Sequence, residues 1–328
     1  SLMALTACTK QQTTGIHLEN LDTTAVAQND FYQYACGGWM KNNPIPDEYS
    51  RFGSFDKLGL SNLEQVNGLI ADIAAGTHKM GSIPQKIGDV YNLSMDTARR
   101  NQEGIAPVLP VLQEIENVTD KAQWSEVLGK AMDFGLWAMY VDADAMNSSM
   151  NILNEYQAGF ALSQKDYYID EDEHTKHIRE EYVKHVEKMF ELFGQENAAE
   201  KAQTVLRLET RLANAALSNV ELRDPVANYN KMSVEELQKL VPEVDWKVYF
   251  AGLNIAPDSL SVGQVRHLQE AGKMLAEESL EDMKTLFTWQ VIDGSADFLT
   301  EEIFMQNFEF YGRILSGRQE PTPLWKRA

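Results

Sequence analysis

The sequence predicts a mainly α-helical protein, built as a multi-helix lobe with one small β-hairpin. Apolar residues recur every three or four positions over most of the chain from residue 61 onward, which is the period of a helix. Between residues 137 and 156 the pattern changes to alternation, which is the period of a strand. The 328 residues are 44% hydrophobic and 24% charged, as in globular proteins with a sizeable core. This length favours about two domains or lobes.

The first predicted helix begins at Ser61. Ser61 and Glu64 have the spacing of a capping box, in which each side chain pairs with the backbone N–H of the other residue. The apolar positions that follow have helical spacing, and Gly76 ends the pattern. These apolar residues are Val66, Leu69, Ile70 and Ile73.

Further segments repeat this helical pattern, and we expect each of them to be a helix. Ser233 and Glu236 form a second capping-box pair at the start of one of them. The segments are residues 85–100, 121–134, 174–194, 198–218, 233–240, 263–274, 280–292 and 301–315.

The alternating interval predicts a β-hairpin with a polar turn at residues 147–149. Apolar side chains occupy every second position before this turn, and a similar pattern follows it. The residues that carry the alternation are Trp137, Met139 and Val141 on one side and Met150, Ile152 and Tyr156 on the other.

Charge and cysteine content exclude several classes of protein. Lysine and arginine number 29 and aspartate and glutamate 49, so the formal net charge is −20. Nucleic acids and anionic membrane surfaces need a basic face, and neither is an expected partner. The sequence has no run of about eighteen apolar residues that would predict a membrane-spanning helix. Its two cysteines are too few for a disulfide framework, and we expect Cys36 to be buried or paired outside this chain.

The first residues resemble the end of a bacterial lipoprotein signal. Leu5-Thr6-Ala7-Cys8 has small residues before a cysteine, and a polar run follows. On this interpretation Cys8 is the lipidated first residue of the mature chain and residues 1–8 are a signal remnant. The protein is then expected in the bacterial cell envelope, as a periplasmic or surface lipoprotein that meets the membrane only through its lipid anchor. The alternative is a frayed N-terminus with an incidental cysteine.

The six histidines do not form the usual hydrolytic zinc motif. H-E-x-x-H places two His side chains one helical turn apart with a Glu that activates water, and none of the histidines has this spacing. The nearest substitute is a set of four residues that fall within about 80° on the helix predicted at 174–194. Either they form a polar face that borders solvent, or they bind metal and the chain is a metal-binding helical protein. The set is His174, His177, Glu181 and His185.

Residues 30–58 combine aromatic side chains, Gly and Pro residues and one isolated arginine, Arg51. We expect an irregular segment whose aromatic side chains pack together and hold Arg51 in place. The aromatic residues concerned are Phe31, Tyr34, Trp39, Phe52 and Phe55.

Short motifs spread along nearly the whole chain carry a family resemblance. In order, they resemble the N-terminal region of the neprilysin and endothelin-converting-enzyme family of zinc metallopeptidases. The most specific are the blocks in residues 30–56 and 223–232. The motifs are 30–35, 37–39, 44–46 and 51–56, then Tyr91 with 95–96, 157–159 with 166–168, 223–225 with 229–232, and 325–327.

The resemblance implies the N-terminal half of a two-lobed metallopeptidase that hydrolyses peptides. Its zinc ligands would lie beyond Ala328, so zinc is the implied cofactor of the full-length protein only. The implied partners are peptide substrates and the C-terminal catalytic half of the same protein. The implied organisation is a linker at 9–29, a segment bracing the catalytic lobe at 30–60, a helical cap lobe at 61–299 and a return segment at 300–328.

The resemblance also gives Arg51 a role. It matches an arginine that in some members of the family binds the C-terminal carboxylate of a short substrate, which a guanidinium can hold with two parallel hydrogen bonds. A second arginine of those members falls on Gly59 here, which favours a looser endopeptidase. Without the resemblance, Arg51 is a surface residue in a turn.

Nothing in these 328 residues is arranged to activate water, so we expect no hydrolysis by this chain alone. The alternative function is a non-catalytic surface lipoprotein that binds peptides.

Overall fold

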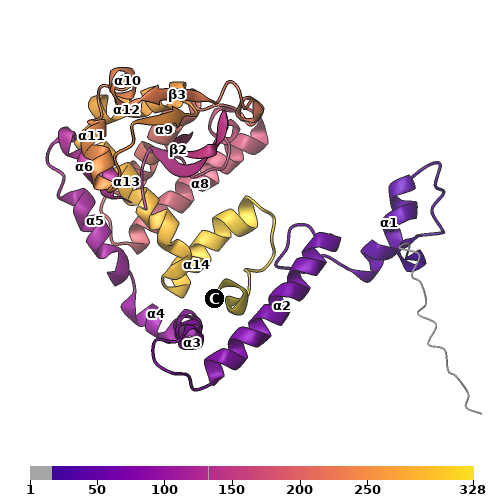
Figure 1. Ribbon diagram of the computed structural model, residues 1–328. Coiled ribbons are helices and arrows are strands. Elements are labelled where there is room, and N and C mark those ends of the chain that lie inside the picture. The colour runs from indigo at the N-terminus through magenta and orange to yellow at the C-terminus, as the bar shows by residue number, and fades with distance from the viewer. Residues whose placement is uncertain (1–16, 132) are drawn as a thin grey trace, which may run out of the picture. The chain divides into compact units, whose positions relative to one another are not determined.

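The computed structural model describes residues 17–131 and 133–328, which fold into two compact units (Figure 1). The first contains the chain up to Gly88 together with Arg318–Arg327, and the second contains Asp89–Gly317. The boundaries predicted at residues 60 and 299 do not coincide with this division, and as functional assignments they stay predictions. The predicted signal remnant and Cys8 lie outside the described residues.

The first unit consists of helices joined by loops. Its elements are η1 (Leu18–Asn20), α1 (Phe31–Asn42), α2 (Ser54–Ala75), the first residues of α3 (Ile83–Met95) and α15 (Leu324–Arg327). Among the described residues, the buried apolar side chains all lie between Ile115 and Phe310, which is within the second unit. The described part of the first unit therefore has no buried apolar core of its own.

Helix α1 corrects the prediction of an irregular segment. Asp30 caps it by accepting a hydrogen bond from the Gln33 N–H at 2.8 Å. Gly37 and Gly38 lie inside the helix, where the chain around η1 passes very close. A Cβ atom on Gly38 would lie 2.7 Å from the Leu21 carbonyl oxygen. These glycines thus permit a close approach of two backbones and do not break the helix.

Helix α2 begins at Ser54, so the predicted start at Ser61 is wrong. The cap is formed by Gly53, whose N–H donates to Asp56 Oδ2 at 2.8 Å. Ser61 and Glu64 have capping-box spacing but lie in the interior of the helix. The capping-box spacing is therefore present in the sequence, but the helix begins earlier, at the cap formed by Gly53.

The second unit holds most of the helices, and the predicted ones are present with shifted ends. The segment 85–100 divides at Asp96, which caps α4 by accepting from the Arg99 N–H. The segment 301–315 continues from α14 into a π-helix, η6 (Phe308–Ile314). The remaining helices are α4 (Thr97–Glu103), η2 (Ala106–Val108), α5 (Leu109–Glu116), η3 (Lys121–Gln123), α6 (Trp124–Lys130), α7 (Asp166–Ile169), α8 (Glu173–Leu192), α9 (Ala198–Ala215), η4 (Glu221–Arg223), α10 (Val234–Leu240), α11 (Trp246–Gly252), α12 (Val265–Glu277), α13 (Leu280–Ser295), η5 (Ala296–Phe298) and α14 (Glu301–Asn307).

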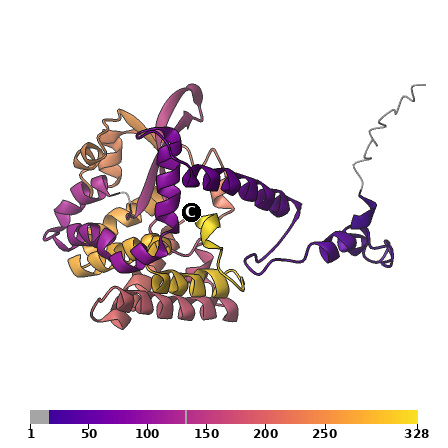
Figure 2. The ribbon, with the colours of Figure 1, turned by 90° about the horizontal axis from the view of Figure 1, so that it is seen from below.

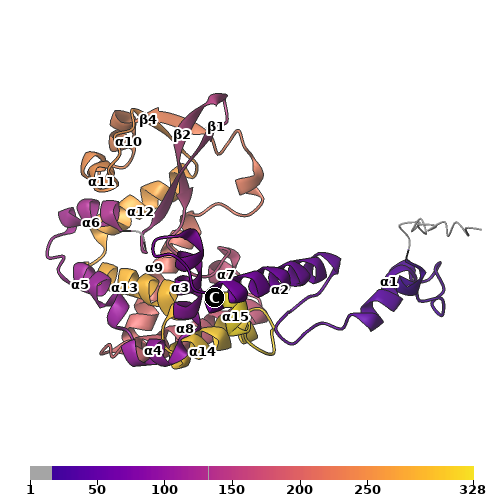
Figure 3. The ribbon, with the colours of Figure 1, turned by 60° about the horizontal axis from the view of Figure 1, so that its bottom comes forward.

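The predicted hairpin belongs to a small mixed sheet in this unit. Strands β1 (Trp137–Asp144) and β2 (Asn147–Gln157) pair antiparallel, and their turn lies before residue 147, not at 147–149. The sequence did not predict β3 (Asn230–Ser233) and β4 (Ser259–Val262), because four residues are too few for a clear alternation. The strand order is β1-β2-β4-β3, with β4 parallel to β2. Figure 2 shows the hairpin, and Figure 3 shows β4 beside β2.

The core of the second unit lies among its helices and the inner face of the sheet. Trp124, Trp246 and Trp289 are each almost fully buried there, and the predicted Ser233–Glu236 capping box is present at α10. Together these features confirm a mainly α-helical fold with a small β-element. Within the described ranges, no helix combines the length and apolar content that crossing a bilayer requires.

Candidate functional site

Arg51 lies in the loop between α1 and α2, where the end of the chain returns. The N–H groups of Gln319 and Glu320 donate to the Asp47 carbonyl at 2.9 and 3.0 Å. Lys326 forms an ion pair with Glu48. Segments from both ends of the chain therefore build this site within the first unit.

Aromatic side chains support the loop only in part. Phe52 stacks on Trp39 with ring centroids 6.2 Å apart and meets Tyr49 edge-on at 5.4 Å. The Lys326 ammonium lies 5.3 Å from the centre of the Tyr49 ring, within range of a cation–π contact. Phe31 meets the Tyr34 ring with centroids 6.4 Å apart but is 70% exposed, and Phe55 is 88% exposed, so neither side chain supports the loop of Arg51.

The residues around Arg51 form a pocket of about 300 Å³. Its two acidic side chains are already engaged, because Glu48 pairs with Lys326 and Asp56 accepts from the Gly53 N–H. Arg51 is exposed and makes no hydrogen bond or ion pair to any described residue. The lining consists of Glu48, Tyr49, Ser50, Arg51, Asp56, Leu63, Arg318, Thr322 and Lys326.

Arg318 brings a second guanidinium to the same pocket, and its Nη1 donates to Thr322 Oγ1 at 3.4 Å. Two arginines in one pocket on a strongly acidic chain suit an anion, since a guanidinium binds a carboxylate through paired N–H donors. The arrangement is therefore suited to binding a carboxylate.

The histidine stripe on α8 does not form a metal site. His174 and His177 are exposed, whereas His185 is buried and stacks on the Phe310 ring with centroids 5.0 Å apart. Its Nδ1 lies 3.3 Å from Gln306 Nε2, and burial lowers the pKa of His185 to about 3. The prediction that His185 borders solvent is therefore wrong. Within residues 17–131 and 133–328, no three His, Cys, Asp or Glu side chains could hold a metal ion, so these residues do not fit a zinc centre.

A buried acid on α9, Glu209, was not predicted from the sequence. Its carboxyl group accepts from the hydroxyls of Tyr182 and Tyr168 at 2.7 and 3.0 Å and from the Ala161 N–H at 3.2 Å. Burial raises the pKa of Glu209 to about 8, and the donated hydrogen bonds only partly offset this rise. A polar residue on the apolar face of α9, between Val205 and Leu212, was the available signal.

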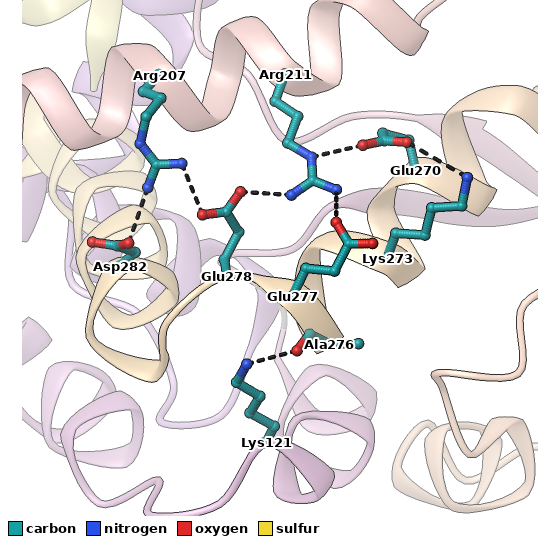
Figure 4. A network of polar contacts seen from close by, with 9 residues as sticks. All are labelled: Lys121, Arg207, Arg211, Glu270, Lys273, Ala276, Glu277, Glu278 and Asp282. Atoms are coloured by element: carbon teal, nitrogen blue, oxygen red, sulfur yellow. Dashed lines mark hydrogen bonds and ion pairs between the residues drawn. The ribbon is translucent and has the colours of Figure 1, made fainter.

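Helix α9 also carries two arginines that link it to α12 and α13 (Figure 4). The Arg211 guanidinium contacts Glu270, Glu277 and Glu278 at 2.5–2.6 Å. Arg207 contacts Glu278 and Asp282 at 2.7 and 2.9 Å. These partly exposed ion pairs connect α9 with the end of α12 and the start of α13.

Comparison with known proteins identifies the family. The model of peptidase family M13 matches residues 27–328. The chain is 24% identical to human endothelin-converting enzyme 1 over 326 residues, covering 94% of this chain and 42% of the relative. It is 30% identical to mouse endothelin-converting enzyme-like 1 over 325 residues, covering 93% and 42%.

A solved structure agrees with this assignment. The zinc metalloprotease Zmp1 of Mycobacterium tuberculosis, in complex with an inhibitor, superposes with a TM-score of 0.90 and 30% identity. The match covers 95% of this chain and 49% of Zmp1, so the chain spans less than half the length of these relatives. The chain belongs to peptidase family M13 and corresponds to the N-terminal region of that family.

Proposed function

We propose that this chain is the N-terminal region of a zinc-dependent endopeptidase that hydrolyses peptides, with the zinc ligands in a C-terminal catalytic half. The observation that carries the proposal is the apolar face of α2, which is exposed within the first unit and suits a packing partner. Family membership and the greater length of the relatives support the same conclusion.

Four side chains define this face, which we call the α2 stripe: Phe55, Leu58, Val66 and Leu69. They fall within about 80° of one another around the helix. Their exposed fractions are 88%, 58%, 50% and 65%. A continuous apolar stripe on a helix normally faces a core. The proposed occupant is the catalytic half, because the relatives have at least as much chain again outside the matched region.

Arg51 is the proposed substrate contact. Its guanidinium has no acceptor among the described residues, and the acids of its pocket are engaged elsewhere. The C-terminal carboxylate of a peptide matches this geometry. Arg318 adds a second guanidinium, so the absence of an arginine at Gly59 does not by itself imply weak selection for a free carboxylate.

The proposed location remains the bacterial cell envelope, with Cys8 as the lipid attachment site. This proposal depends on the sequence Leu5-Thr6-Ala7-Cys8 alone. Incorporation of a radiolabelled fatty acid into the protein, lost in Cys8→Ser, would support it.

The function is tested with a protein in which this chain continues into its C-terminal half. We expect that protein to cleave peptides and to lose activity with a zinc chelator, whereas the 328-residue chain alone does not cleave. A longer protein that binds peptides without cleaving them would instead support the non-catalytic peptide-binding alternative.

Charge on the α2 stripe is expected to abolish assembly with the catalytic half. Val66→Asp combined with Leu69→Asp would bury two carboxylates without partners, which costs several kcal/mol. Co-purification of the separately tagged halves measures the effect. Glu64→Lys changes charge on the opposite face of the same helix and is the matched control. Equal recovery of the double variant and the control would contradict an interface at this stripe.

A further inference from the structure

A cleft of about 460 Å³ lies entirely within the second unit, beside the start of β1. The end of α6, the segment after β2, α11 and the C-terminal half of α13 complete its walls. Most of the side chains around it are apolar or aromatic. They include Leu128, Phe134, Leu136, Trp137, Phe160 and Trp289.

One acidic side chain in this wall is unusual. Asp293 lines the cleft, and its Oδ1 is buried and makes no hydrogen bond of normal geometry to a described residue, although the Tyr311 hydroxyl lies near it. Its neighbour Gln290 is satisfied, because Gln290 Oε1 accepts from the Gly135 N–H at 2.9 Å. A buried carboxyl group with only a weak contact to one tyrosine hydroxyl costs free energy, so its presence in a cleft wall calls for an explanation.

The cleft is accessible from solvent. Three residues of its lining, Asp133, Ala138 and Gly294, are exposed. A Cβ atom built on Gly294 would meet no atom within 4 Å, so open space lies in front of this helical glycine, one residue from Asp293. A small molecule or the end of a peptide can therefore enter the cleft beside Asp293.

We propose that this cleft binds an apolar primary ammonium group, with the ammonium on Asp293 and the apolar body against the aromatic wall. A carboxylate supplies the charge-assisted acceptor, and rings such as Trp289 and Phe160 supply faces that attract a cation. The free N-terminus of a peptide that begins with an apolar residue has this chemistry. Binding here involves no cleavage and does not depend on the proposed function.

Ligand affinity at this site should depend on pH, because binding is coupled to the protonation of Asp293. Burial raises the pKa of Asp293 to about 7, and the nearby Tyr311 hydroxyl only partly offsets the rise. A bound ammonium favours the ionised carboxylate, so affinity for a permanently charged amine rises between pH 6 and pH 8 with release of a proton. The other titratable groups that face Asp293 or the cleft are Tyr311, Asp297, Glu209, Tyr182, Tyr249 and Asp133.

Isothermal titration of the 328-residue chain with phenethylamine and with the neutral 2-phenylethanol tests the proposal. We expect phenethylamine to bind at least about tenfold more tightly than the alcohol at pH 8, with a smaller ratio at pH 6. Asp293→Asn should remove this preference. Gly294→Leu should block both ligands, because the new side chain enters the open space.

The control is Glu302→Gln, which neutralises an exposed acid on α14 and should leave the affinity for both ligands unchanged. Equal affinity for amine and alcohol, no binding of either, or unchanged binding in both Asp293→Asn and Gly294→Leu would overturn the proposal. Circular dichroism of each variant establishes that the fold is kept. Because Gly294 tolerates a side chain without a clash, the test does not depend on Asp293→Asn alone.

Discussion

Arg51→Met is expected to lower kcat/KM about tenfold to a hundredfold for peptides with a free C-terminal carboxylate, since hydrogen bonds between charged groups contribute about 1.5–3 kcal/mol. The substitution removes a guanidinium that has no other acceptor in its pocket. Methionine keeps a similar length and loses only the charge and the donors. The measurement uses the protein that carries both halves, and so presupposes the proposed function.

Peptides with an amidated C-terminus test whether the loss of activity depends on the free carboxylate of the substrate. Arg51→Met should affect their cleavage little, and Arg318→Met should reduce the preference for the free carboxylate in the same direction. Arg99→Met removes an exposed arginine of α4 that pairs only with Glu103, and it serves as the control. An equal loss on both peptides would show that Arg51 does not bind the carboxylate, while no cleavage of any peptide would refute the proposed function itself.

Glu209→Ala is expected to destabilise the second unit by about 3–6 kcal/mol, because each buried donor left without an acceptor costs about 1–3 kcal/mol. The Tyr168 and Tyr182 hydroxyls and the Ala161 N–H all lose their acceptor. Rotation does not rescue the hydroxyls easily, since each already accepts a hydrogen bond, from the Leu162 N–H and from Trp289 Nε1 respectively. Urea denaturation followed by fluorescence measures the loss.

The buried carboxyl group of Glu209 should also make the stability of the fold depend on pH. The pKa of Glu209 is about 8 in the fold and 4.5 in the unfolded chain, so the folded state holds its proton over a wider pH range. The contribution of this carboxyl group to the free energy of unfolding is fully present below about pH 4.5. It falls by about 1.4 kcal/mol per pH unit until about pH 8. Asp293 and Glu155, with pKa values raised to about 7, act in the same direction.

Glu209→Gln should therefore flatten the decline in the free energy of unfolding between pH 5 and pH 7.5. Glu302→Gln, an exposed substitution of the same kind, should leave the slope unchanged. If the two variants show the same slope, the carboxyl group of Glu209 is not protonated in the folded state at neutral pH.

Much of the fold could be predicted from the spacing of residues that are near one another in the sequence. Residues 174–194 and 198–218 were predicted as helices because their apolar period is helical, and α8 and α9 match those ranges to within three residues at each end. The hairpin at 137–156 and the Ser233–Glu236 cap were equally visible, since each depends on neighbours within a few positions. The family resemblance was visible for a similar reason, because short ordered motifs survive when most other residues change.

Other features depended on contacts between distant residues. The start of α2 was misplaced because two possible caps compete, and the sequence does not say which one the surrounding chain favours. His185 was assigned to a solvent-bordering stripe, but η6 packs against that side of α8 and buries it. The acceptor role of Glu209 depends on tyrosines and backbone from α7, α8 and the segment after β2.

By itself, then, the sequence determined the helical class, the hairpin and the family resemblance, and it singled out Arg51. Periodicity and short motifs are local properties of the chain, so they can be seen without the structure. Only the tertiary structure decided that Arg318 and Lys326 lie in the pocket of Arg51, that the acids there are engaged, and that Asp293 lines a separate cleft. These are juxtapositions of residues far apart in the sequence, and they are fixed by packing and burial, which no local pattern encodes.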